Sequence, residues 1–199
     1  MMFRICSSLH RSAVTAAKES KRFYSDAGKL VTVTTDDKSG ISTVSLNRPP
    51  VNGLNYDLLQ SISTALTTLE KSKCRGMILT SDNPSVFSAG LDILEMYKPD
   101  PARVKDFWTT LQDTWIKLYT TSFPTVALIN GHSPAGGCLL ALSSLPRKMT
   151  KLEFREATVN WLLNNKEKDL QIFLNYINQP KVQEGLGMYL ESLKKKSAK

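Results

Sequence analysis

Two short glycine-containing segments hold the residues best suited to chemistry, residues 87–92 (FSAGLD) and residues 131–138 (GHSPAGGC). Each follows an apolar run that predicts a buried strand, and each precedes a segment expected to be helical. Glycine at such a turn lets the backbone adopt strained angles and lets a ligand approach closely. The free N–H groups at a helix start also point outward. Two such turns on neighbouring strands could direct two N–H donors at one carbonyl oxygen, forming an oxyanion hole.

Spacing alone leaves another interpretation open, because a Gly-Gly turn before a helix is more often structural than functional. No other residues form a catalytic constellation. His132 is the only histidine after residue 24, and no acid lies near it in sequence, so we interpret it as structural or exposed. Cys6, Cys74 and Cys138 are too scattered for a disulfide framework or a metal cluster. We therefore expect no metal site.

The elements that must position these turns follow an α/β pattern. Alternation of β-branched and polar residues predicts a hairpin, short apolar runs predict buried strands, and apolar residues at helical spacing predict helices. The hairpin is expected at residues 29–35 and 41–46, buried strands at 76–80 and 124–129, and helices after Asn55, around Phe107 to Leu118, and from Gly136. Trp108 and Trp115 are interpreted as core residues. Residues 148–199 are predicted to be helical and highly charged, with a break at Pro180.

The chain has 199 residues, 41% hydrophobic and 22% charged, which is typical of a soluble globular protein of one or two domains. The net charge is +8, and about half of it lies in the first 24 residues, where five basic residues face only Glu19. The remaining charge is modest, and no zinc-ligand spacing or RNA-binding signature accompanies it. We therefore expect neither a nucleic-acid partner nor a membrane span.

Residues 1–24 are basic, rich in Ser and Ala and nearly free of acids, which predicts a mitochondrial transit peptide. We expect this segment to lie outside the fold, with cleavage before Ser25 and a mature protein in the mitochondrial matrix. A disordered basic tail is the alternative.

The two turns, with the strands before them, resemble the paired signatures of the crotonase (enoyl-CoA hydratase/isomerase) family. Residues 47–54 (NRPPVNGL) resemble the early loop of that family, and the three segments occur in the expected order. The resemblance implies a crotonase-like spiral of strand–helix units, and the final fifty residues resemble the C-terminal helices of its isomerase members. It divides the chain into a transit peptide (1–24), an incomplete acyl-CoA-binding core (25–145) and a C-terminal helical region (146–199).

The resemblance also implies roles for individual residues. The backbone N–H groups of Ala89 and Gly136 would hold the thioester oxygen and stabilise an enolate, with no side-chain nucleophile. Gly90, Leu91, Asp92 and Ile93 would flank the coenzyme A arm, and Pro50 and Val51 would lie near the adenine. Coenzyme A would be part of the substrate, so no separate cofactor is implied. The family's homotrimer is a further expectation.

The sequence departs from the family where the carboxylates should be. Hydratases carry a glutamate directly after the Gly-Gly-Cys turn, where this chain has Leu139. Isomerases carry theirs after one more strand, but here the chain passes from Ser143 through Pro146 directly into charged helices. No catalytic base is assigned. Six later acids alternate with basic residues, as on solvated helix faces, namely Glu153, Glu156, Glu167, Asp169, Glu184 and Glu191.

Three functions remain open at this point. The first is Δ3,Δ2-enoyl-CoA isomerisation in mitochondrial fatty-acid β-oxidation, with weak or absent turnover in this chain. The second is a non-catalytic acyl-CoA-binding or regulatory subunit of a crotonase-family oligomer. The third is a helical adaptor with no relation to coenzyme A. The basic Lys194 to Lys196 would contact CoA phosphates in the first two, although a solvated helix end is the simpler interpretation.

Overall fold

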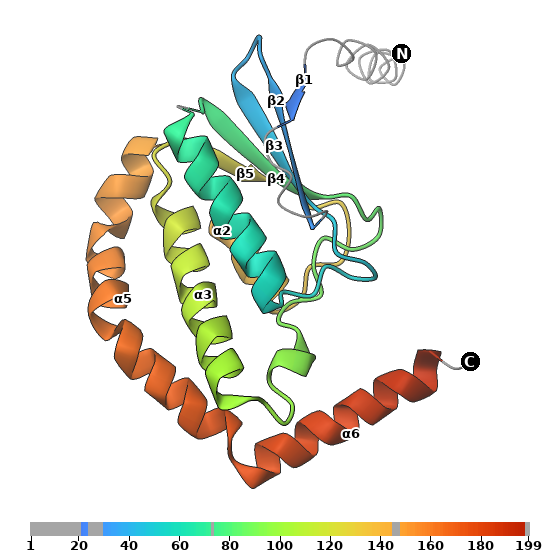
Figure 1. Cartoon of the computed structure of the whole chain (residues 1–199). Helices are drawn as coiled ribbons and strands as arrows, with labels where there is room; N and C mark the ends of the chain where they lie inside the picture. Colours follow the sequence, from blue (N-terminus) through green and yellow to red (C-terminus); the bar gives the residue numbers. More distant parts are fainter. Residues whose placement is uncertain (1–20, 24–29, 73, 145–147, 198–199) are drawn as a thin grey trace, which may run out of the picture.

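The fold is built on one mixed sheet (Figure 1). The structure is a computed structural model and describes residues 21–23, 30–72, 74–144 and 148–197. The sheet has five strands in the order β1-β2-β3-β4-β5. β1 to β3 pair antiparallel, whereas β3, β4 and β5 pair parallel. The strands are β1 (Lys21–Phe23), β2 (Val31–Asp36), β3 (Ile41–Leu46), β4 (Gly76–Ser81) and β5 (Thr125–Ala127).

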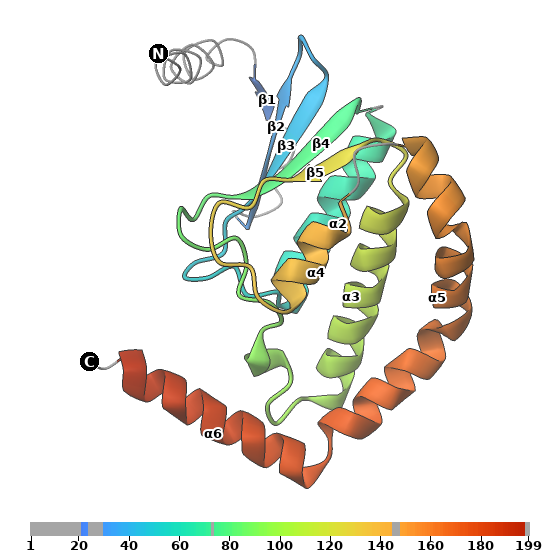
Figure 2. The same cartoon turned by 180° about the vertical axis from the view of Figure 1, so that it is seen from behind.

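Five α-helices and one short 3₁₀ helix accompany the sheet in the described chain (Figures 1 and 2). The helices α2, α3 and α4 lie on one face of the sheet, α5 runs along the outer side of α3, and α6 extends away below them. The helices are α2 (Tyr56–Lys71), the 3₁₀ helix η2 (Ile93–Glu95), α3 (Pro101–Thr120), α4 (Gly136–Leu142), α5 (Lys148–Ile177) and α6 (Pro180–Ser197).

Local sequence explains where these helices begin. The side chain of Asn55 caps α2 by accepting from the Leu58 amide, and that of Asp100 caps α3 by accepting from the Arg103 amide. Pro180 starts α6, because a proline at a first helical position lacks only an N–H that would be unpaired there. The predicted hairpin, the helix after Asn55 and the break at Pro180 are therefore confirmed.

The core lies between the sheet and helices α2 and α3. Its largest fully buried side chains include Phe87 and Phe107, together with apolar residues of β3, β4 and α2. A smaller cluster, Val104, Phe173 and Ile177, joins α3 to α5, and the rings of Trp108 and Phe173 stack with their centroids 3.6 Å apart. The C-terminal helices are thus held chiefly through α3.

Three predictions need correction. β5 was expected to be buried, but it is the edge strand, and Val126, Leu128 and Ile129 are exposed. The helix that directly follows the FSAGLD turn is only the short 3₁₀ helix η2, and the long helix α3 begins later, at Pro101. Residues 1–24 were expected to lie outside the fold, but residues 21–23 form β1, which pairs with the open edge of β2. The other residues of that segment, 1–20 and 24, lie outside the described residues.

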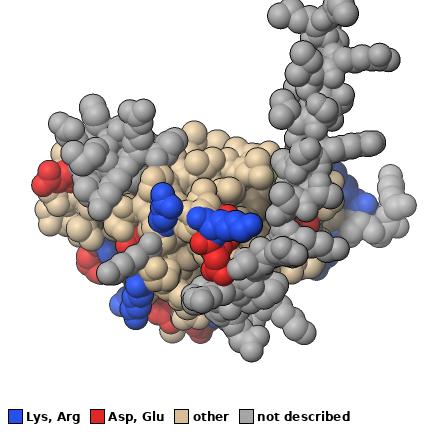
Figure 3. Space-filling view, turned by 90° about the horizontal axis from the view of Figure 1, so that it is seen from above, with Lys and Arg blue, Asp and Glu red and all other residues tan. Residues whose placement is uncertain are grey.

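Seen from above (Figure 3), the described basic side chains are interspersed with acidic and uncharged ones on the visible surface. No helix of the described chain is long and apolar enough to cross a membrane.

Candidate functional site

The early loop is fixed to the first glycine turn by the buried side chain of Asn52. Its Nδ2 donates to Ser81 Oγ at 2.7 Å and to the Phe87 carbonyl at 3.0 Å, and its Oδ1 accepts from the Arg48 amide at 2.7 Å. Ser88 Oγ completes the connection by donating to the Asn52 carbonyl at 2.8 Å. One side chain therefore sets the position of residues 48–53 relative to residues 87–88.

The first turn presents the Leu91 amide, not the Ala89 amide. The Ala89 N–H donates to the Val51 carbonyl at 2.9 Å, so it is unavailable to a ligand. Gly90 has a φ of 90°, a left-handed conformation that side chains disfavour. The Gly90 carbonyl and the Asp92 amide both bond to Leu54, which leaves the Leu91 N–H between them facing the opposite side. Within the described chain, that N–H has no hydrogen-bond partner.

The second turn is joined to the first through His132. The Phe87 amide donates to the His132 carbonyl at 2.8 Å, and the His132 amide donates to the Ser85 carbonyl at 2.9 Å. Ala135 has a φ of 47° and precedes α4 without a side-chain cap. The Gly137 and Leu139 amides donate back to the Pro134 and Ala135 carbonyls, whereas the Gly136 N–H has no partner among the described residues. The His132 side chain is exposed, as predicted.

These two free amides lie side by side. A Cβ atom placed on Gly136 would lie 3.3 Å from the Leu91 nitrogen, and one placed on Gly90 would lie 3.1 Å from the Gly136 nitrogen. Gly136 also begins α4, so its N–H adds the positive end of a short helix. The Gly136 amide thus lies where the two turns meet, whereas the Ala89 amide is bonded to Val51, and the amide of the first turn that lies beside Gly136 is that of Leu91.

The amide pair opens onto a cavity of about 1050 Å³. Its walls are largely apolar and come from η2, α3, α4 and α5. Trp108 and Trp115 from α3 and Trp161 and Leu162 from α5 lie on these walls. A cavity at the upper end of the usual ligand-pocket range, ~300–1000 Å³, can hold an extended apolar group.

One carboxylate, Asp169, lies on the cavity wall among the described residues. Its Oδ2 accepts from Trp108 Nε1 and from Gln112 Nε2, both at 2.8 Å. Leu139, the position of the hydratase glutamate, also lines the cavity. Among the described residues the wall thus offers one carboxylate, and one of its two oxygens is already held by two donors.

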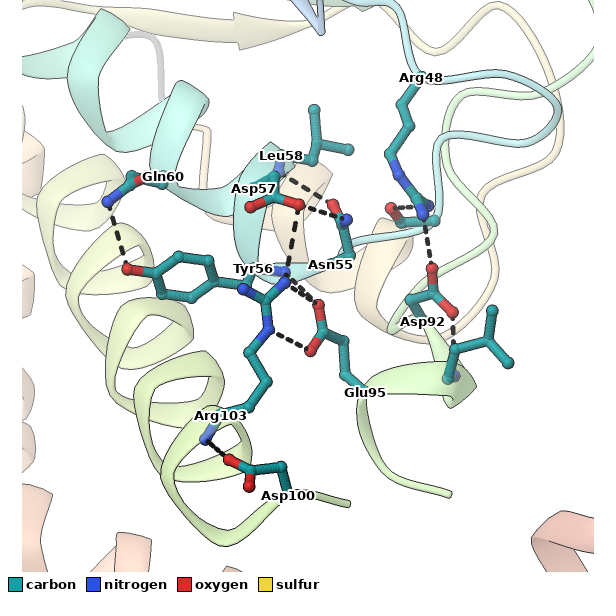
Figure 4. A network of polar contacts seen from close by, with 12 residues as sticks. Arg48, Asn55, Tyr56, Asp57, Leu58, Gln60, Asp92, Glu95, Asp100 and Arg103 are labelled. Carbon is teal, nitrogen blue, oxygen red and sulfur yellow. Dashed lines mark hydrogen bonds and ion pairs between the residues drawn. The ribbon is translucent and has the colours of Figure 1, made fainter. Parts of the chain in front are cut away.

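A separate polar network joins η2, which follows the first glycine turn, to α2 and α3 (Figure 4). The buried Glu95 accepts from the Tyr56 amide at 2.9 Å and from Arg103 Nε and Nη2 at 3.0 and 2.9 Å. Burial alone would raise the pKa of Glu95, but the hydrogen bonds from Arg103 and Tyr56 and the charges of Arg103 and Arg48 outweigh it. The pKa is therefore lowered, and an ionised Glu95 joins η2 to α2 and α3.

The structure brings together only part of the predicted substrate-binding set. Ala89, Leu91, Ile93 and Gly136 line the cavity. The other predicted residues lie behind or beside it and have structural partners instead. Gly90 is buried beneath the amide pair, Asp92 forms an ion pair with Arg48 at 2.8 Å, Pro50 accepts from Asn83 Nδ2, and Val51 accepts from Ala89.

Sequence reasoning missed two features of the site. It did not assign the Leu91 amide, although Leu91 directly follows the glycine of the first turn and that position was the available signal. It also did not assign the α5 wall, because Trp161 and Leu162 stand in a charged segment with little helical periodicity. Asp169 was interpreted as part of a solvated face, yet it binds two side chains of α3.

Comparison with known proteins gives a consistent set of relatives. A model of the family described as enoyl-CoA hydratase/isomerase matches residues 36–145. Mouse mitochondrial enoyl-CoA delta isomerase 1 is 31% identical over 274 aligned positions, covering 94% of this chain and 93% of the mouse protein. The rat protein of the same name is 42% identical over 134 residues, covering 67% of this chain and 44% of the rat protein.

The crystal structure of human mitochondrial delta3-delta2-enoyl-CoA isomerase superposes with a TM-score of 0.79 at 27% identity. That superposition covers 84% of this chain and 99% of the human chain. The mouse alignment is longer than the 199 residues of this chain, so part of the mouse protein has no counterpart here. Against the rat relative, the chain spans less than half of the length.

Proposed function

The chain belongs to the enoyl-CoA hydratase/isomerase family, a family of enzymes, and from this premise we propose that it binds fatty acyl-CoA thioesters in the cavity beside Leu91 and Gly136. In this proposal the two free amides hold the thioester oxygen. The acyl chain extends along the apolar walls supplied by α3 and α5. The observation that carries the proposal is the pair of adjacent amides at the cavity that have no partner among the described residues.

The amide pair suits enolate chemistry. Removing a proton from C2 of a 3-enoyl thioester moves negative charge onto the thioester oxygen, and fixed N–H donors stabilise that charge without a side-chain nucleophile. Because both donors are backbone groups positioned by glycine turns, they need no reorganisation during reaction. The site therefore supports Δ3,Δ2-enoyl-CoA isomerisation by its electrostatics.

Proton transfer limits the reaction. Moving the double bond requires a base that takes a proton from C2 and returns one at C4. Leu139 occupies the position where hydratases have glutamate, and the Asp169 Oδ2 is already bound by Trp108 and Gln112. We therefore expect acyl-CoA binding with slow isomerisation and no two-acid hydration. A non-catalytic acyl-CoA-binding subunit is the second candidate, favoured by the apolar Leu139 and by the two donors on Asp169 Oδ2.

The proposed setting is mitochondrial fatty-acid β-oxidation, in the matrix. Its support is that the relatives named above are mitochondrial and that residues 1–24 have the composition of a transit peptide. Fusion of residues 1–30 to a fluorescent protein tests this part separately, and a cytosolic fusion would contradict it.

Calorimetric titration with octanoyl-CoA and with free CoA tests binding. We expect octanoyl-CoA to bind more tightly than CoA. Gly136→Pro should weaken octanoyl-CoA about 5- to 10-fold relative to Gly136→Ala, since one hydrogen bond is worth roughly 1 kcal/mol. Both variants add a Cβ atom, but only proline removes the N–H, and proline is tolerated at a first helical position. Equal affinities for the two variants would contradict the amide assignment.

An isomerisation assay with a 3-enoyl-CoA then separates the two candidate functions. Turnover that falls in Gly136→Pro supports the enzyme, whereas tight binding without turnover supports the binding subunit. Failure of every acyl-CoA to bind the folded chain would contradict both and would leave the adaptor hypothesis.

A further inference from the structure

A second cavity lies between α5 and α6, which meet in a bend near the start of α3 (Figures 1 and 2). We call it the α5–α6 cleft, and its volume is about 610 Å³. Its apolar wall includes Phe173 and Ile177 of α5 and Leu186 of α6. Met96 and Trp108 line this cleft as well as the cavity beside the amide pair, so the two cavities are neighbours with a shared wall.

The α5–α6 cleft is fixed by contacts of its own walls. The Gln183 side chain accepts from the Lys98 amide at 2.7 Å and donates to the Met96 carbonyl at 2.9 Å and to the Ile177 carbonyl at 2.7 Å. These bonds join α6 both to the segment after η2 and to the end of α5. Val182 of α6 also packs on the small core cluster that joins α3 to α5. The cleft is therefore preformed.

A glycine widens the cleft on one side. A Cβ atom placed on Gly185 would meet nothing within 4 Å, whereas one placed on Gly187 would lie 3.1 Å from the Tyr97 ring. Gly185 follows Lys181 by four residues, so both lie on the same side of α6. The missing side chain at residue 185 thus leaves open space beside Lys181.

Two side-chain donors stand on this otherwise apolar wall, the ammonium of Lys181 and the hydroxyl of Tyr176. Both residues are exposed, and neither donor has a hydrogen-bond or ion-pair partner among the described residues. The indole N–H of Trp108 is already bound to Asp169. Among the described residues of the wall, Lys181 is the one that carries a charge. The cleft therefore suits a ligand with one anionic head and an apolar body.

Charge and volume narrow the ligand further. The several phosphate charges of coenzyme A would meet a single cation in the α5–α6 cleft, and an acyl chain already has the larger cavity, of about 1050 Å³, beside the amide pair. A neutral apolar ligand would gain nothing from Lys181 and Tyr176. The volume of the cleft lies within the usual range for small ligands, ~300–1000 Å³. A single-chain monoanion meets all three conditions.

We propose that the α5–α6 cleft binds the anion of a free fatty acid. The carboxylate would pair with Lys181 and accept a hydrogen bond from Tyr176. The chain would lie against Phe173, Ile177 and Leu186. This site is separate from the amide pair, so a fatty acid and an acyl-CoA could be bound together.

Titration with dodecanoate and with 1-dodecanol, in the presence of excess octanoyl-CoA, tests the site. We expect saturable binding of dodecanoate to the full chain. Lys181→Met should weaken dodecanoate about 2- to 5-fold, the size expected for an exposed ion pair, and should leave 1-dodecanol unchanged. Gly185→Leu should weaken both ligands about tenfold or more, because its side chain would occupy the space beside Lys181.

Two matched variants serve as controls. Lys168→Met removes an exposed lysine of α5 that does not line the cleft, and Gly185→Ala adds only one methyl group. Both should bind dodecanoate as the wild type does. The proposal is overturned if the folded wild type binds no dodecanoate, if Lys181→Met binds it as tightly as Lys168→Met, or if Gly185→Leu binds it as tightly as Gly185→Ala. Failure of octanoyl-CoA to bind would contradict the acyl-CoA proposal alone, since Lys181 and Gly185 do not line that cavity.

Discussion

The guanidinium of Arg103 forms two parallel hydrogen bonds to the carboxylate of Glu95, from Nε at 3.0 Å and from Nη2 at 2.9 Å (Figure 4). Arg103 also lies over the Tyr56 ring, 4.4 Å from its centroid. Glu95 belongs to η2, Tyr56 begins α2 and Arg103 lies in the first turn of α3. The pair therefore holds the first glycine turn against the helices that form the cavity wall.

Replacement of Arg103 should destabilise the protein. Arg103→Ala leaves the buried Glu95 without its main partner, and we expect the free energy of unfolding at pH 7 to fall by about 2 kcal/mol. Arg103→Lys keeps the charge but loses the parallel geometry, so an intermediate loss is expected. Urea unfolding measures both, and equal stability of Arg103→Ala and the wild type would show that the pair contributes nothing.

Stability should depend on pH through Glu95. Its folded pKa lies below the ordinary value of 4.5, so its ionised form stabilises the folded state. That contribution is complete above pH 4.5 and is lost as the pH falls through the lower, folded pKa. The stability difference between the wild type and Glu95→Gln should therefore shrink below pH 4.5. A difference that stays constant in acid would refute this assignment.

Substitution at Gly90 should close the site. Gly90→Ala adds a Cβ atom 3.1 Å from the Gly136 nitrogen at a φ of 90°. We expect loss of octanoyl-CoA affinity and a stability loss of about 1 kcal/mol. Gly185→Ala is the control, because nothing lies within 4 Å of the added atom and the residue is in a helix interior. This control should gain up to about 1 kcal/mol in unfolding experiments and bind octanoyl-CoA normally.

Affinity should rise with acyl-chain length. Each methylene buried against the cavity wall contributes about 0.8 kcal/mol, so the dissociation constant should fall roughly fourfold per carbon from butyryl- to decanoyl-CoA. Trp161→Ala should weaken decanoyl-CoA more than butyryl-CoA, because Trp161 lines the cavity from α5. Ile172→Ala, outside the cavity, should change neither. A flat chain-length series would place the acyl chain elsewhere.

A carboxylate at position 139 should restore proton transfer. Leu139 lies three residues after Gly136, hence on the same side of α4, and it lines the cavity. Leu139→Glu should raise turnover of an enoyl-CoA by about 10²-fold or more, whereas the uncharged Leu139→Gln should not. Both variants must be assayed with 2-enoyl- and 3-enoyl-CoA. Equal rates for the two variants would argue against this position.

Loss of Arg155 should loosen α5. Its buried Nη1 donates to the carbonyls of Tyr119 and Ser143, both at 3.1 Å, near the C-termini of α3 and α4. Burial lowers the pKa of Arg155, and no described carboxylate pairs with it, so these carbonyls and the Tyr119 ring compensate its charge. Arg155→Met should cost about 2 kcal/mol and speed hydrogen exchange in α5 more than in the sheet. Uniform exchange rates would contradict this.

Local patterns predicted most of the fold. Alternation located the hairpin, and apolar spacing located α2 and α3, whose caps the structure places at Asn55 and Asp100. The burial of β5 was not predictable in the same way, because its exposure depends on which elements pack beside it and not on its own sequence. An apolar strand has the same pattern whether or not a neighbour covers it.

The sequence located the two turns of the candidate site but not the free amide of the first turn. The glycine turns identified where amides would be free, but the choice between Ala89 and Leu91 depends on the Val51 carbonyl, which reaches Ala89 from a distant loop. The contribution of α5 to the cavity wall was not predicted, for a related reason. Its cavity-facing residues are defined by packing on α3, and no periodic stripe marks them in the sequence.

The hydrogen bonds of Asn52 tie the first glycine turn to β4 and the early loop, so that part of the candidate site is built without any contribution from residues after α4. The apolar wall, in contrast, comes partly from α5. The two parts can therefore diverge independently during evolution. Descendants of this chain could acquire new acyl preferences through mutations in a single helix, while the reactive end of the ligand stayed in register.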